Sequence, residues 1–377
     1  MKIILDVTRV VRRVTKGQVL TGIDRVTMAY VQYYSDASAL VRWCGHSWVL
    51  SPQQSKKLFN YLETPGSLFK LIYHVIRGII ENKKNDGRAF LLNTGHVGLN
   101  QSDYKRLMHK RGVKPVFFVH DLIPIIHPEY CSLGEDLRQK EKTNHILSLG
   151  CGIITNSKAT LDDLLTYSHQ SQKMLPQTEV ALLGPGFSMA TPGQSPLKKP
   201  YFVILSTIEP RKNHLLLLQI WRKLFQELGS QTPHLFIIGK RGWECENAVD
   251  LLERCAFLKE VVTEVSLCSD AELVTYLYYC KALLFPSFIE GYGLPLIESL
   301  SLGTPVIASD LSVFREIAND IPEYVDPLDG KKWEQLIIEY AQSESTKRAA
   351  QIKRMNHLKI PTWAEHFSKV NSFLEKL

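Results

Sequence analysis

The residues best suited to chemistry lie in a glycine-containing loop between an apolar run and a helix-like segment. The apolar run ends at Phe285, Glu290 lies in the loop, and Pro295 suits the first turn of a helix. Glycines let the backbone approach a ligand, and the N–H groups at a helix start favour a phosphate. Glu290 and Glu298 would then accept hydrogen bonds from hydroxyl groups, such as those of a sugar and a ribose. The same sequence also fits a plain strand, turn and helix with a surface glutamate.

Two adjacent cations follow another apolar run. Arg211 and Lys212 come after Pro210, just beyond the run 201–206. An arginine binds phosphate oxygens through two N–H groups and a lysine acts as a point charge, so the pair suits a diphosphate. Alone this segment would be a solvated turn, but together with the glycine loop it predicts a diphosphate site. The sequence contains no Asp-x-Asp tripeptide, so we expect neither a metal ion nor another cofactor.

Polar residues also follow apolar runs in the first half of the chain. His120 and Asp121 come directly after 115–119, and His96 closes the weaker motif Asn-Thr-Gly-His. Either these side chains hydrogen-bond a substrate, or Asp121 caps a helix beside a half-buried histidine.

Two loops are further candidates for phosphate or nucleotide contacts. Gly22 ends a polar loop, 12–22, whose backbone amides would face a phosphate. Lys240 and Arg241 form a basic turn after 234–239, which either lines a nucleotide pocket or lies on the surface.

These residues need a framework that brings the ends of several strands together. The chain alternates continuous apolar runs with helix-like segments, a pattern typical of parallel sheets covered on both faces. The predicted strands are 1–6, 115–119, 152–155, 201–206, 234–239, 282–285, 305–309 and 324–327. Ligands of open parallel sheets bind at the carboxyl ends of the strands. We therefore expect an α/β protein with two Rossmann-like domains and a site in the cleft between them.

A change in composition predicts the domain boundary. Residues 187–200 are rich in Pro, Ser, Gly and Thr and have no periodicity, which indicates a linker. We predict one domain over 1–187, a linker over 188–200 and a second domain over 201–361. Apolar residues at helical spacing predict a closing helix over 362–377.

Composition is that of a globular protein. Of the 377 residues, 45% are hydrophobic and 22% charged, which argues against disorder, collagen and coiled coil. Seven cysteines without a Cys-x-x-Cys pair favour a reducing cytoplasm over a disulfide framework or a zinc site. No run of about 18 apolar residues predicts a membrane span, and Asp6 comes too early for a signal peptide.

The charge is unevenly distributed. Residues 1–150 contain 22 Lys and Arg against 12 Asp and Glu, the remainder 23 against 26, and these balances of +10 and −3 give the net +7. A solvated basic face explains the asymmetry, and so does attraction to an anionic membrane or a charged substrate. Nucleic acid is not expected as a partner, because no binding module accompanies the dispersed charges.

Together these motifs resemble the family 4 retaining glycosyltransferases of the GT-B fold, in the branch that builds bacterial surface polysaccharide and lipopolysaccharide. The second half carries E-x7-E within FPSFIEGYGLPLIESLSLGTPVIASD, preceded by PRKN, IIGKRGW and SDAELVTYLYYC. The first half carries TGIDRV, NTGH, HDLIP and ITNSKAT. Several motifs in family order make the resemblance specific.

The resemblance implies a role for each candidate residue. Arg211 and Lys212 would neutralise the leaving diphosphate, and Glu290 would hold hydroxyls of the donor sugar. His120 would lie near the transferred sugar. The donor-binding residues would be Gly22, Glu298, Gly291, Tyr292, Gly293, Leu294, Lys240 and Arg241, and the acceptor-binding residues would be His96 and Asp121.

The resemblance also implies a reaction. A nucleotide-sugar donor would bind mainly to 201–361 and a lipid-linked glycan acceptor to 1–187, on which 362–377 packs. The transferred sugar would be a hexose, with mannose or rhamnose as the first choice. Transfer would retain the anomeric configuration and need no metal, and charge stabilisation of the leaving diphosphate would be its main catalytic effect. The enzyme would act in the cytoplasm, with peripheral binding to the inner face of the membrane as a hypothesis. The alternatives are a nucleotide-sugar-binding GT-B module and a sugar-nucleotide epimerase, neither with transfer activity.

Overall fold

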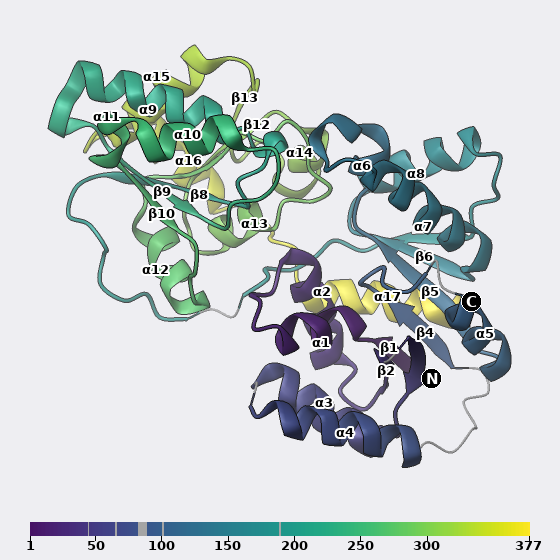
Figure 1. Cartoon of the computed structure of the whole chain (residues 1–377). Helices are drawn as coiled ribbons and strands as arrows, with labels where there is room; N and C mark the ends of the chain where they lie inside the picture. The colour runs from purple at the N-terminus through teal and green to yellow at the C-terminus, as the bar shows by residue number, and fades with distance from the viewer. Residues whose placement is uncertain (44, 65, 82–88, 100–101, 188–189) are drawn as a thin grey trace. The chain divides into compact units, whose positions relative to one another are not determined.

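The computed structural model divides into two units, each built around one sheet (Figure 1). It describes residues 1–43, 45–64, 66–81, 89–99, 102–187 and 190–377. Unit 1 comprises 1–122, 137–186 and 362–377, and unit 2 comprises 123–136 and 187–361. The predicted α/β class with two parallel-sheet domains is confirmed.

The sheet of unit 1 has seven strands in the order β3-β2-β1-β4-β5-β6-β7. All the described pairings are parallel except that of β2 with β3. The strands are β1 Ile3–Asp6, β2 Ser38–Trp43, β3 His46–Val49, β4 Phe90–Asn93, β5 Lys114–Val119, β6 Gly152–Thr155 and β7 Gln177–Val180. The central strands read as continuous apolar runs because helices cover both faces. The strand order changes direction between β1 and β4.

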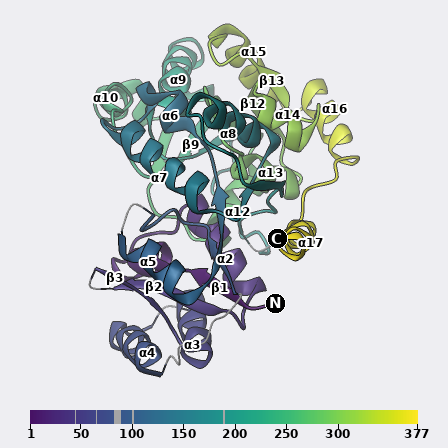
Figure 2. The ribbon, with the colours of Figure 1, turned by 90° about the vertical axis from the view of Figure 1, so that its right-hand side faces the viewer.

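The helices that lie wholly or mainly in unit 1 are α1 Thr8–Thr15, α2 Gly22–Tyr33, α3 Pro52–Glu63, α4 Leu68–Glu81, α5 Ser102–Arg111, α7 Glu135–Leu149, α8 Lys158–Gln170 and α17 Trp363–Lys376. The last of these is the predicted closing helix, drawn in yellow in Figures 1 and 2. It packs against α2. The rings of Phe367 and Tyr33 are stacked with their centroids 3.9 Å apart, and Nε2 of His366 lies 2.9 Å from the Tyr30 hydroxyl.

The sheet of unit 2 has six parallel strands in the order β10-β9-β8-β11-β12-β13. They are β8 Tyr201–Leu205, β9 His234–Ile238, β10 Val262–Val265, β11 Leu283–Phe285, β12 Val306–Ser309 and β13 Glu323–Val325. This is the doubly wound order in which the first and fourth strands of the unit are neighbours. The direction of winding therefore changes between β8 and β11.

The helices of unit 2 are α6 Ile123–Ile126, α9 His214–Leu228, α10 Glu246–Arg254, α11 Ala256–Lys259, α12 Asp270–Tyr279, α13 Leu294–Ser301, α14 Ser312–Ala318, α15 Gly330–Ala341 and α16 Thr346–Met355. Short 3-10 turns cover Pro128–Tyr130, Pro210–Lys212 and Gly229–Gln231. Trp221 of α9 and Trp333 of α15 are fully buried in one core with Phe202 of β8.

The structure differs from the sequence prediction at the loop 12–22. Its first residues belong to α1, which begins directly after β1 because Oδ1 of Asp6 accepts a hydrogen bond from the N–H of Thr8 at 3.0 Å. Val10 and Val11 are then buried, which holds the helix against the sheet.

The units also differ in detail from the predicted domains 1–187 and 201–361. Residues 123–136 belong to unit 2 although they lie in the first half of the chain. Within the predicted linker, residues 188 and 189 lie outside the described residues, and 190–200 contain neither helix nor strand.

Candidate active site

In unit 2 the predicted cations and the predicted glycine loop follow neighbouring strands. β8 leads into the turn Pro210–Lys212, and β11 leads into the loop 286–293. These are the strands at which the winding changes direction, where doubly wound sheets bind ligands. The N–H of Phe288 donates to the carbonyl oxygen of Arg211 at 2.8 Å, which ties the loop to the turn.

Four charged side chains meet there, and we call them the ion cluster: Glu209, Arg211, Lys212 and Glu290. Nη1 of Arg211 donates to Oε2 of Glu290 at 2.8 Å, and Nζ of Lys212 donates to Oε1 of the same carboxylate. Nε of Arg211 lies 2.6 Å from Oε1 of Glu209. Oγ of Ser287 donates to Oε1 of Glu290 at 2.7 Å. The cluster thus balances two cations against two carboxylates.

Burial and neighbouring charges shift the pKa values of three groups in the ion cluster. The exposed fraction of the side chain is 8% for Glu290, 10% for Lys212 and 3% for Glu209. Burial alone would raise the pKa of Glu290, but the charges of Lys212 and Arg211 lower it to about 2. Burial raises the pKa of Glu209 and lowers that of Lys212, in each case against the attraction of the opposite charges. Glu290 is therefore ionised at neutral pH.

The loop ends in a helix start that requires a glycine. α13 begins at Leu294, one residue before the predicted Pro295, and Gly293 is its N-cap. The φ angle of Gly293 is 122°, and a Cβ there would lie 2.7 Å from Cε1 of Phe314. Another residue would therefore strain the backbone and displace a core ring.

The two glutamates of E-x7-E are buried. Glu290 lies in the ion cluster, and Glu298 is 4% exposed within α13. The alternative of a surface glutamate is therefore wrong for both. Gly291 and Tyr292 complete the loop between Glu290 and α13, and the Tyr292 ring is buried.

Lys240 and Arg241 follow β9, the strand beside β8. Lys240 is exposed, and its carbonyl oxygen accepts from the N–H of Ile208 at 2.9 Å. Nη2 of Arg241 lies 2.8 Å from Oε1 of Glu264, and its Nη1 donates to Glu253. Arg241 thus pairs with carboxylates outside the ion cluster.

Tyr130 contacts the glycine loop and was not predicted. Its ring stacks on that of Phe288, with centroids 5.6 Å apart and planes at 2°. Its carbonyl oxygen accepts from Nε1 of Trp243 at 3.1 Å. Tyr130 lies in 123–136, so this contact follows from the chain segment that joins unit 2 from the first half. No local pattern around Tyr130 indicates a partner so far along the chain.

In unit 1 the two predicted histidines lie together at the carboxyl edge of the sheet. Nε2 of His120 donates to the carbonyl oxygen of Thr94 at 2.7 Å, and Nε2 of His96 donates to that of Phe118. The ring centroids are 5.5 Å apart. Burial lowers the pKa of His120 to about 4, and burial and the charge of His120 lower the pKa of His96 to about 3. Both rings are neutral at pH 7, so Nδ1 of each is a hydrogen-bond acceptor. Asp121 follows β5 and is half-buried.

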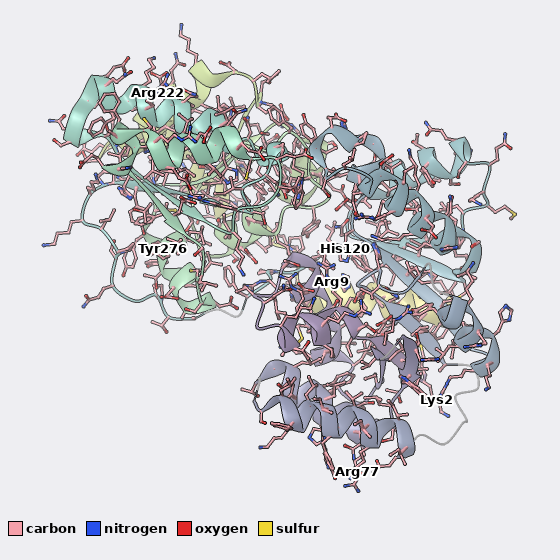
Figure 3. The ribbon with its side chains drawn as sticks, viewed as in Figure 1. Lys2, Arg9, Arg77, His120, Arg222 and Tyr276 are labelled. Carbon is pink, nitrogen blue, oxygen red and sulfur yellow. The ribbon has the colours of Figure 1, made fainter. Side chains whose placement is uncertain are left out.

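The predicted Gly22 loop is held by a buried carboxylate, Asp24. Nε of Arg9 and Nε of Arg13 each lie 2.9 Å from one oxygen of Asp24, whose side chain is fully buried. The N–H of Thr21 donates to the same carboxylate at 2.8 Å and starts α2 beside Gly22. Figure 3 shows Arg9 and His120 at the same edge of unit 1. Asp24 is part of the motif TGIDRV, but its pairing with Arg9 and Arg13 of α1 depends on the fold.

A second buried carboxylate, Asp6, lies at the end of β1 and was not predicted to be a site residue. Its Oδ2 accepts from Nδ2 of Asn93 at 3.1 Å, and that amide also donates to the Tyr104 hydroxyl at 2.8 Å. Asp6 and Asn93 end β1 and β4, the strands where the winding of unit 1 changes direction. Burial raises the pKa of Asp6 to about 6.

We expect Asp6→Asn to change the pH dependence of stability. Because the pKa of Asp6 is raised from 3.8 to about 6 on folding, the wild type gains stability as the pH falls through 6 toward 3.8. The gain is about 3 kcal/mol. The melting temperature of the variant should lack this rise, whereas the control Asp36→Asn, an exposed carboxylate, should keep it. Parallel curves for wild type and Asp6→Asn would contradict the assignment.

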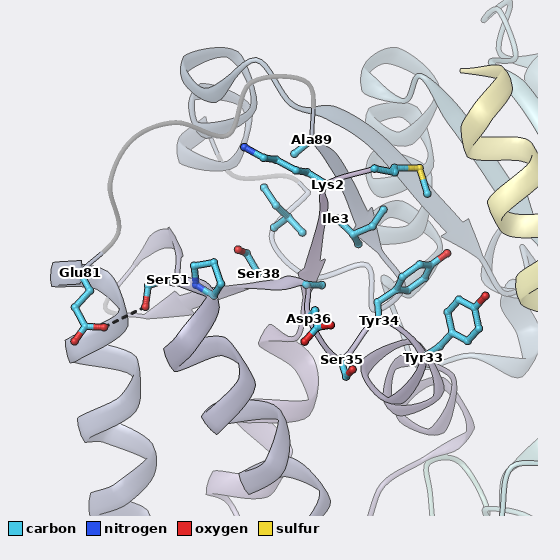
Figure 4. A pocket seen from close by; sticks show the side chains of 14 residues that line it. Lys2, Ile3, Tyr33, Tyr34, Ser35, Asp36, Ser38, Ser51, Glu81 and Ala89 are labelled. Atoms are coloured by element: carbon cyan, nitrogen blue, oxygen red, sulfur yellow. Dashed lines mark hydrogen bonds between the residues drawn. The ribbon is translucent and has the colours of Figure 1, made fainter.

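A hollow of about 670 Å³ lies at the opposite edge of the unit 1 sheet (Figure 4). Lys2, Ser38 and Ala89, at the starts of β1, β2 and β4, line it. None of the predicted site residues does. Among the described residues, no group of three or more His, Cys, Asp or Glu side chains is arranged to hold a metal ion.

Comparison with known proteins connects this geometry to a family. The family described as Glycosyl transferases group 1 matches residues 190–356, which contain the ion cluster. The chain is 29% identical over 239 residues to the serotype-specific mannosyltransferase WbdA of Escherichia coli, covering 56% of this chain and 28% of that protein. It is 32% identical over 164 residues to the O-antigen chain mannosyltransferase B of Escherichia coli, covering 43% of this chain and 42% of that protein. The chain thus spans less than half the length of either relative.

A solved structure matches the whole chain. HepE of Anabaena, crystallised in complex with UDP and glucose, superposes with a TM-score of 0.68 and 17% identity over 100% of both chains. At this identity the likeness is one of fold, and this chain's part of it is two consecutive sheets in doubly wound order. Residues 190–356 thus match a glycosyl transferases group 1 domain, and the chain has the GT-B fold.

Proposed function

We propose that the chain is a hexosyltransferase that moves a sugar from a nucleotide-diphosphate donor to a growing glycan, with retention of configuration and without a metal ion. The observation that carries the proposal is a pair of cations, half-buried Arg211 and buried Lys212, at the switch point of the sheet in a glycosyl transferases group 1 domain. Stabilising the departing diphosphate is the main electrostatic demand of such a transfer.

In this proposal the reaction needs no protein base. The bond from the anomeric carbon to the donor phosphate oxygen breaks, and the bond to the acceptor oxygen forms on the same face. The acceptor's proton passes to the departing phosphate oxygen. Arg211 and Lys212 hold that oxygen's charge. Because both side chains are already fixed by Glu290, little reorganisation opposes charge development.

We assign two tasks to Glu290. It fixes both cations, and it accepts a hydrogen bond from one hydroxyl of the donor sugar. A carboxylate offers about four lone-pair positions. Arg211, Lys212 and Ser287 take three of them, which leaves one for the sugar. Glu298 is assigned to the ribose, and the N–H groups of 291–294 to the diphosphate.

The carboxyl edge of unit 1 is assigned to the sugar and the acceptor. Neutral His120 presents Nδ1 as an acceptor, which suits a hydroxyl of the transferred sugar. His96 and Asp121 are assigned to the acceptor glycan, and Gly22 to the donor diphosphate.

The identity of the substrates is proposed from the relatives. WbdA and O-antigen chain mannosyltransferase B are mannosyltransferases, so mannose is our first choice of sugar and rhamnose the next. The acceptor would be a lipid-linked surface polysaccharide or lipopolysaccharide glycan in the cytoplasm, at the inner face of the membrane. Metal independence is supported by the two cations Arg211 and Lys212 at the place that we assign to the diphosphate, and by a sequence without Asp-x-Asp.

The test is release of nucleoside diphosphate from a panel of GDP-, UDP- and dTDP-sugars, with and without EDTA, in the presence of a fluorescent lipid-linked glycan. We expect EDTA-resistant release from one donor and a product with the donor's anomeric configuration by NMR. Activity that EDTA abolishes and Mg²⁺ restores would contradict metal independence. An inverted product would contradict retention.

The same assay separates the two alternatives. A nucleotide-sugar-binding module would gain melting temperature from one donor but release no diphosphate. An epimerase would change the sugar of the donor without any acceptor. Either result would replace the transferase proposal.

A further inference from the structure

α4 packs on the body of unit 1 through one narrow face. Leu71, Val75 and Gly78 of α4 are buried. A Cβ on Gly78 would lie 2.9 Å from Cβ of Leu50 and 3.0 Å from Cβ of Gln54 in α3, so the helices touch closely. Figures 1 and 2 both show α4 lying along α3. Ile72, His74 and Ile79 beside this face are half-buried, and Nδ1 of His74 lies 3.0 Å from Oε1 of Gln54. We call α3 and α4 together the α3–α4 hairpin.

The outward face of α4 is apolar. Phe69, Tyr73, Ile76 and Ile80 are spaced by four, three and four residues, which aligns them on one face. Their exposed fractions are 83%, 51%, 49% and 77%. A surface helix of a globular protein normally carries polar residues at such positions. We call these four residues the α4 stripe.

Cations flank the α4 stripe. Lys70 and Arg77 lie on α4 and Lys57 lies on α3, and all three are exposed. All three lie near His74. Burial lowers the pKa of His74, and the charges of these three residues lower it further. Glu81, paired with Arg77, is the acidic residue of α4. The hairpin thus combines a continuous apolar row with a positive border.

We propose that the α4 stripe binds the surface of an anionic lipid bilayer, with α4 lying in the plane of the headgroups. Aromatic and aliphatic side chains on one helix face enter the boundary of the acyl chains, while flanking lysines and arginines reach the lipid phosphates. Among the described residues, no helix is long and apolar enough to cross a membrane. In this proposal α4 lies in the headgroup region, so the binding is peripheral.

The charges favour lipid over a second copy of the chain. Pairing two α4 stripes about a twofold axis would bring Lys57 and Lys70 of both copies to one interface, where like charges repel. An anionic lipid surface meets the same cations with opposite charge.

Binding of a bilayer through the α4 stripe leaves the carboxyl edge of the unit 1 sheet uncovered. Figure 3 shows Arg77 on the far side of this unit from Arg9 and His120. The biological role of this binding rests on the proposed function, because a lipid-linked acceptor would be held in a bilayer. The binding itself requires neither donor nor acceptor, so it is measured without them.

The test is flotation of the full chain with neutral phosphatidylcholine vesicles and with vesicles that contain phosphatidylglycerol. We expect the wild type to float with the anionic vesicles. Phe69→Ser/Ile80→Ser should lower the partition coefficient at least about tenfold. Lys57→Glu/Lys70→Glu should lower it about tenfold or more on anionic vesicles only. The matched control is Met174→Ser, which removes an apolar side chain of unit 1 that is 90% exposed.

Three outcomes would overturn the proposal. The first is a wild-type protein that does not float with anionic vesicles. The second is a Met174→Ser variant whose partition coefficient falls as much as that of Phe69→Ser/Ile80→Ser. The third is a wild-type dimer by light scattering that Phe69→Ser/Ile80→Ser makes monomeric without any vesicle binding. Equal melting temperatures of the variants exclude misfolding, and intact transfer to a soluble acceptor would keep the proposed function separate from this result.

Discussion

Replacing both Arg211 and Lys212 by alanine is expected to lower the rate of sugar transfer by about 100- to 1,000-fold or more. Both cations lie in the ion cluster, at the carboxyl ends of the strands where the winding of unit 2 changes direction. Their removal leaves the charge of the departing diphosphate without its fixed counter-charges. The measurement is the initial rate of nucleoside diphosphate release from the donor that the wild type turns over.

The control for this variant is Arg315→Ala. Arg315 is also a cation of unit 2 with two carboxylate partners, Asp310 and Asp320, but its side chain is 45% exposed. We expect its loss to leave transfer unchanged, because exposed ion pairs contribute little. Normal turnover in the Arg211→Ala/Lys212→Ala variant would refute the diphosphate assignment.

Stability must be measured beside activity in the double variant. Without Arg211 and Lys212, the carboxylates of Glu209 and Glu290 are buried without counter-charges, and the pKa of Glu290 must rise from about 2. We therefore expect a lower melting temperature at neutral pH, and circular dichroism at the assay temperature establishes that the rate reports on folded protein. The sequence alone predicted no such cost.

Strand ends were the most predictable feature of this chain. Continuous apolar runs such as 201–206 and 282–285 can hardly be other than buried strands of a parallel sheet, since helices must cover both faces. Once the sheet is parallel, the residues after each run share one edge. This reasoning puts Arg211, Lys212 and the loop of Glu290 at one edge of the sheet, and the strand order of the structure then makes them neighbours.

The pairing inside the site was not predictable in the same way. Glu290 was expected to meet sugar hydroxyls, yet its two oxygens accept from Arg211, Lys212 and Ser287. The groups that a carboxylate meets depend on the backbone geometry of the turn and the loop. Residue types alone do not specify that geometry. Tyr130 was missed for a related reason, because its partner Phe288 is remote in the sequence.

Periodicity also left the role of α4 undetermined. The apolar run 71–80 does not itself specify which of its side chains face solvent. Which face is covered depends on α3, whose contact with Gly78 fixes the rotation of α4 about its axis. Only then do Phe69 and Ile80 become an outward row rather than part of a core.

Replacing Glu290 by glutamine is expected to abolish most of the transfer and to remove an acid-sensitive contribution to stability. Glutamine keeps the shape of the side chain but not the charge that fixes Arg211 and Lys212. The buried Lys212 then has one counter-charge fewer, and breaking such a pair costs about 3–5 kcal/mol. Transfer falls because the cations are no longer fixed where the diphosphate departs, while Asp310→Asn, at an exposed pair, should be nearly silent.

The pH dependence separates this effect from a simple loss of packing. The pKa of Glu290 is lowered from 4.5 to about 2 on folding, so its contribution of about 3 kcal/mol is complete above pH 4.5 and is lost as the pH falls toward 2. The melting temperatures of wild type and Glu290→Gln should therefore differ most above pH 4.5 and converge toward pH 2. This window, from about pH 2 to 4.5, overlaps that of Asp6, from pH 3.8 to about 6, only between 3.8 and 4.5, and the two groups change stability with opposite sign. A difference that stays constant down to pH 2 would mean that the carboxylate is not held by the two cations, and the proposed diphosphate site would lose its physical basis.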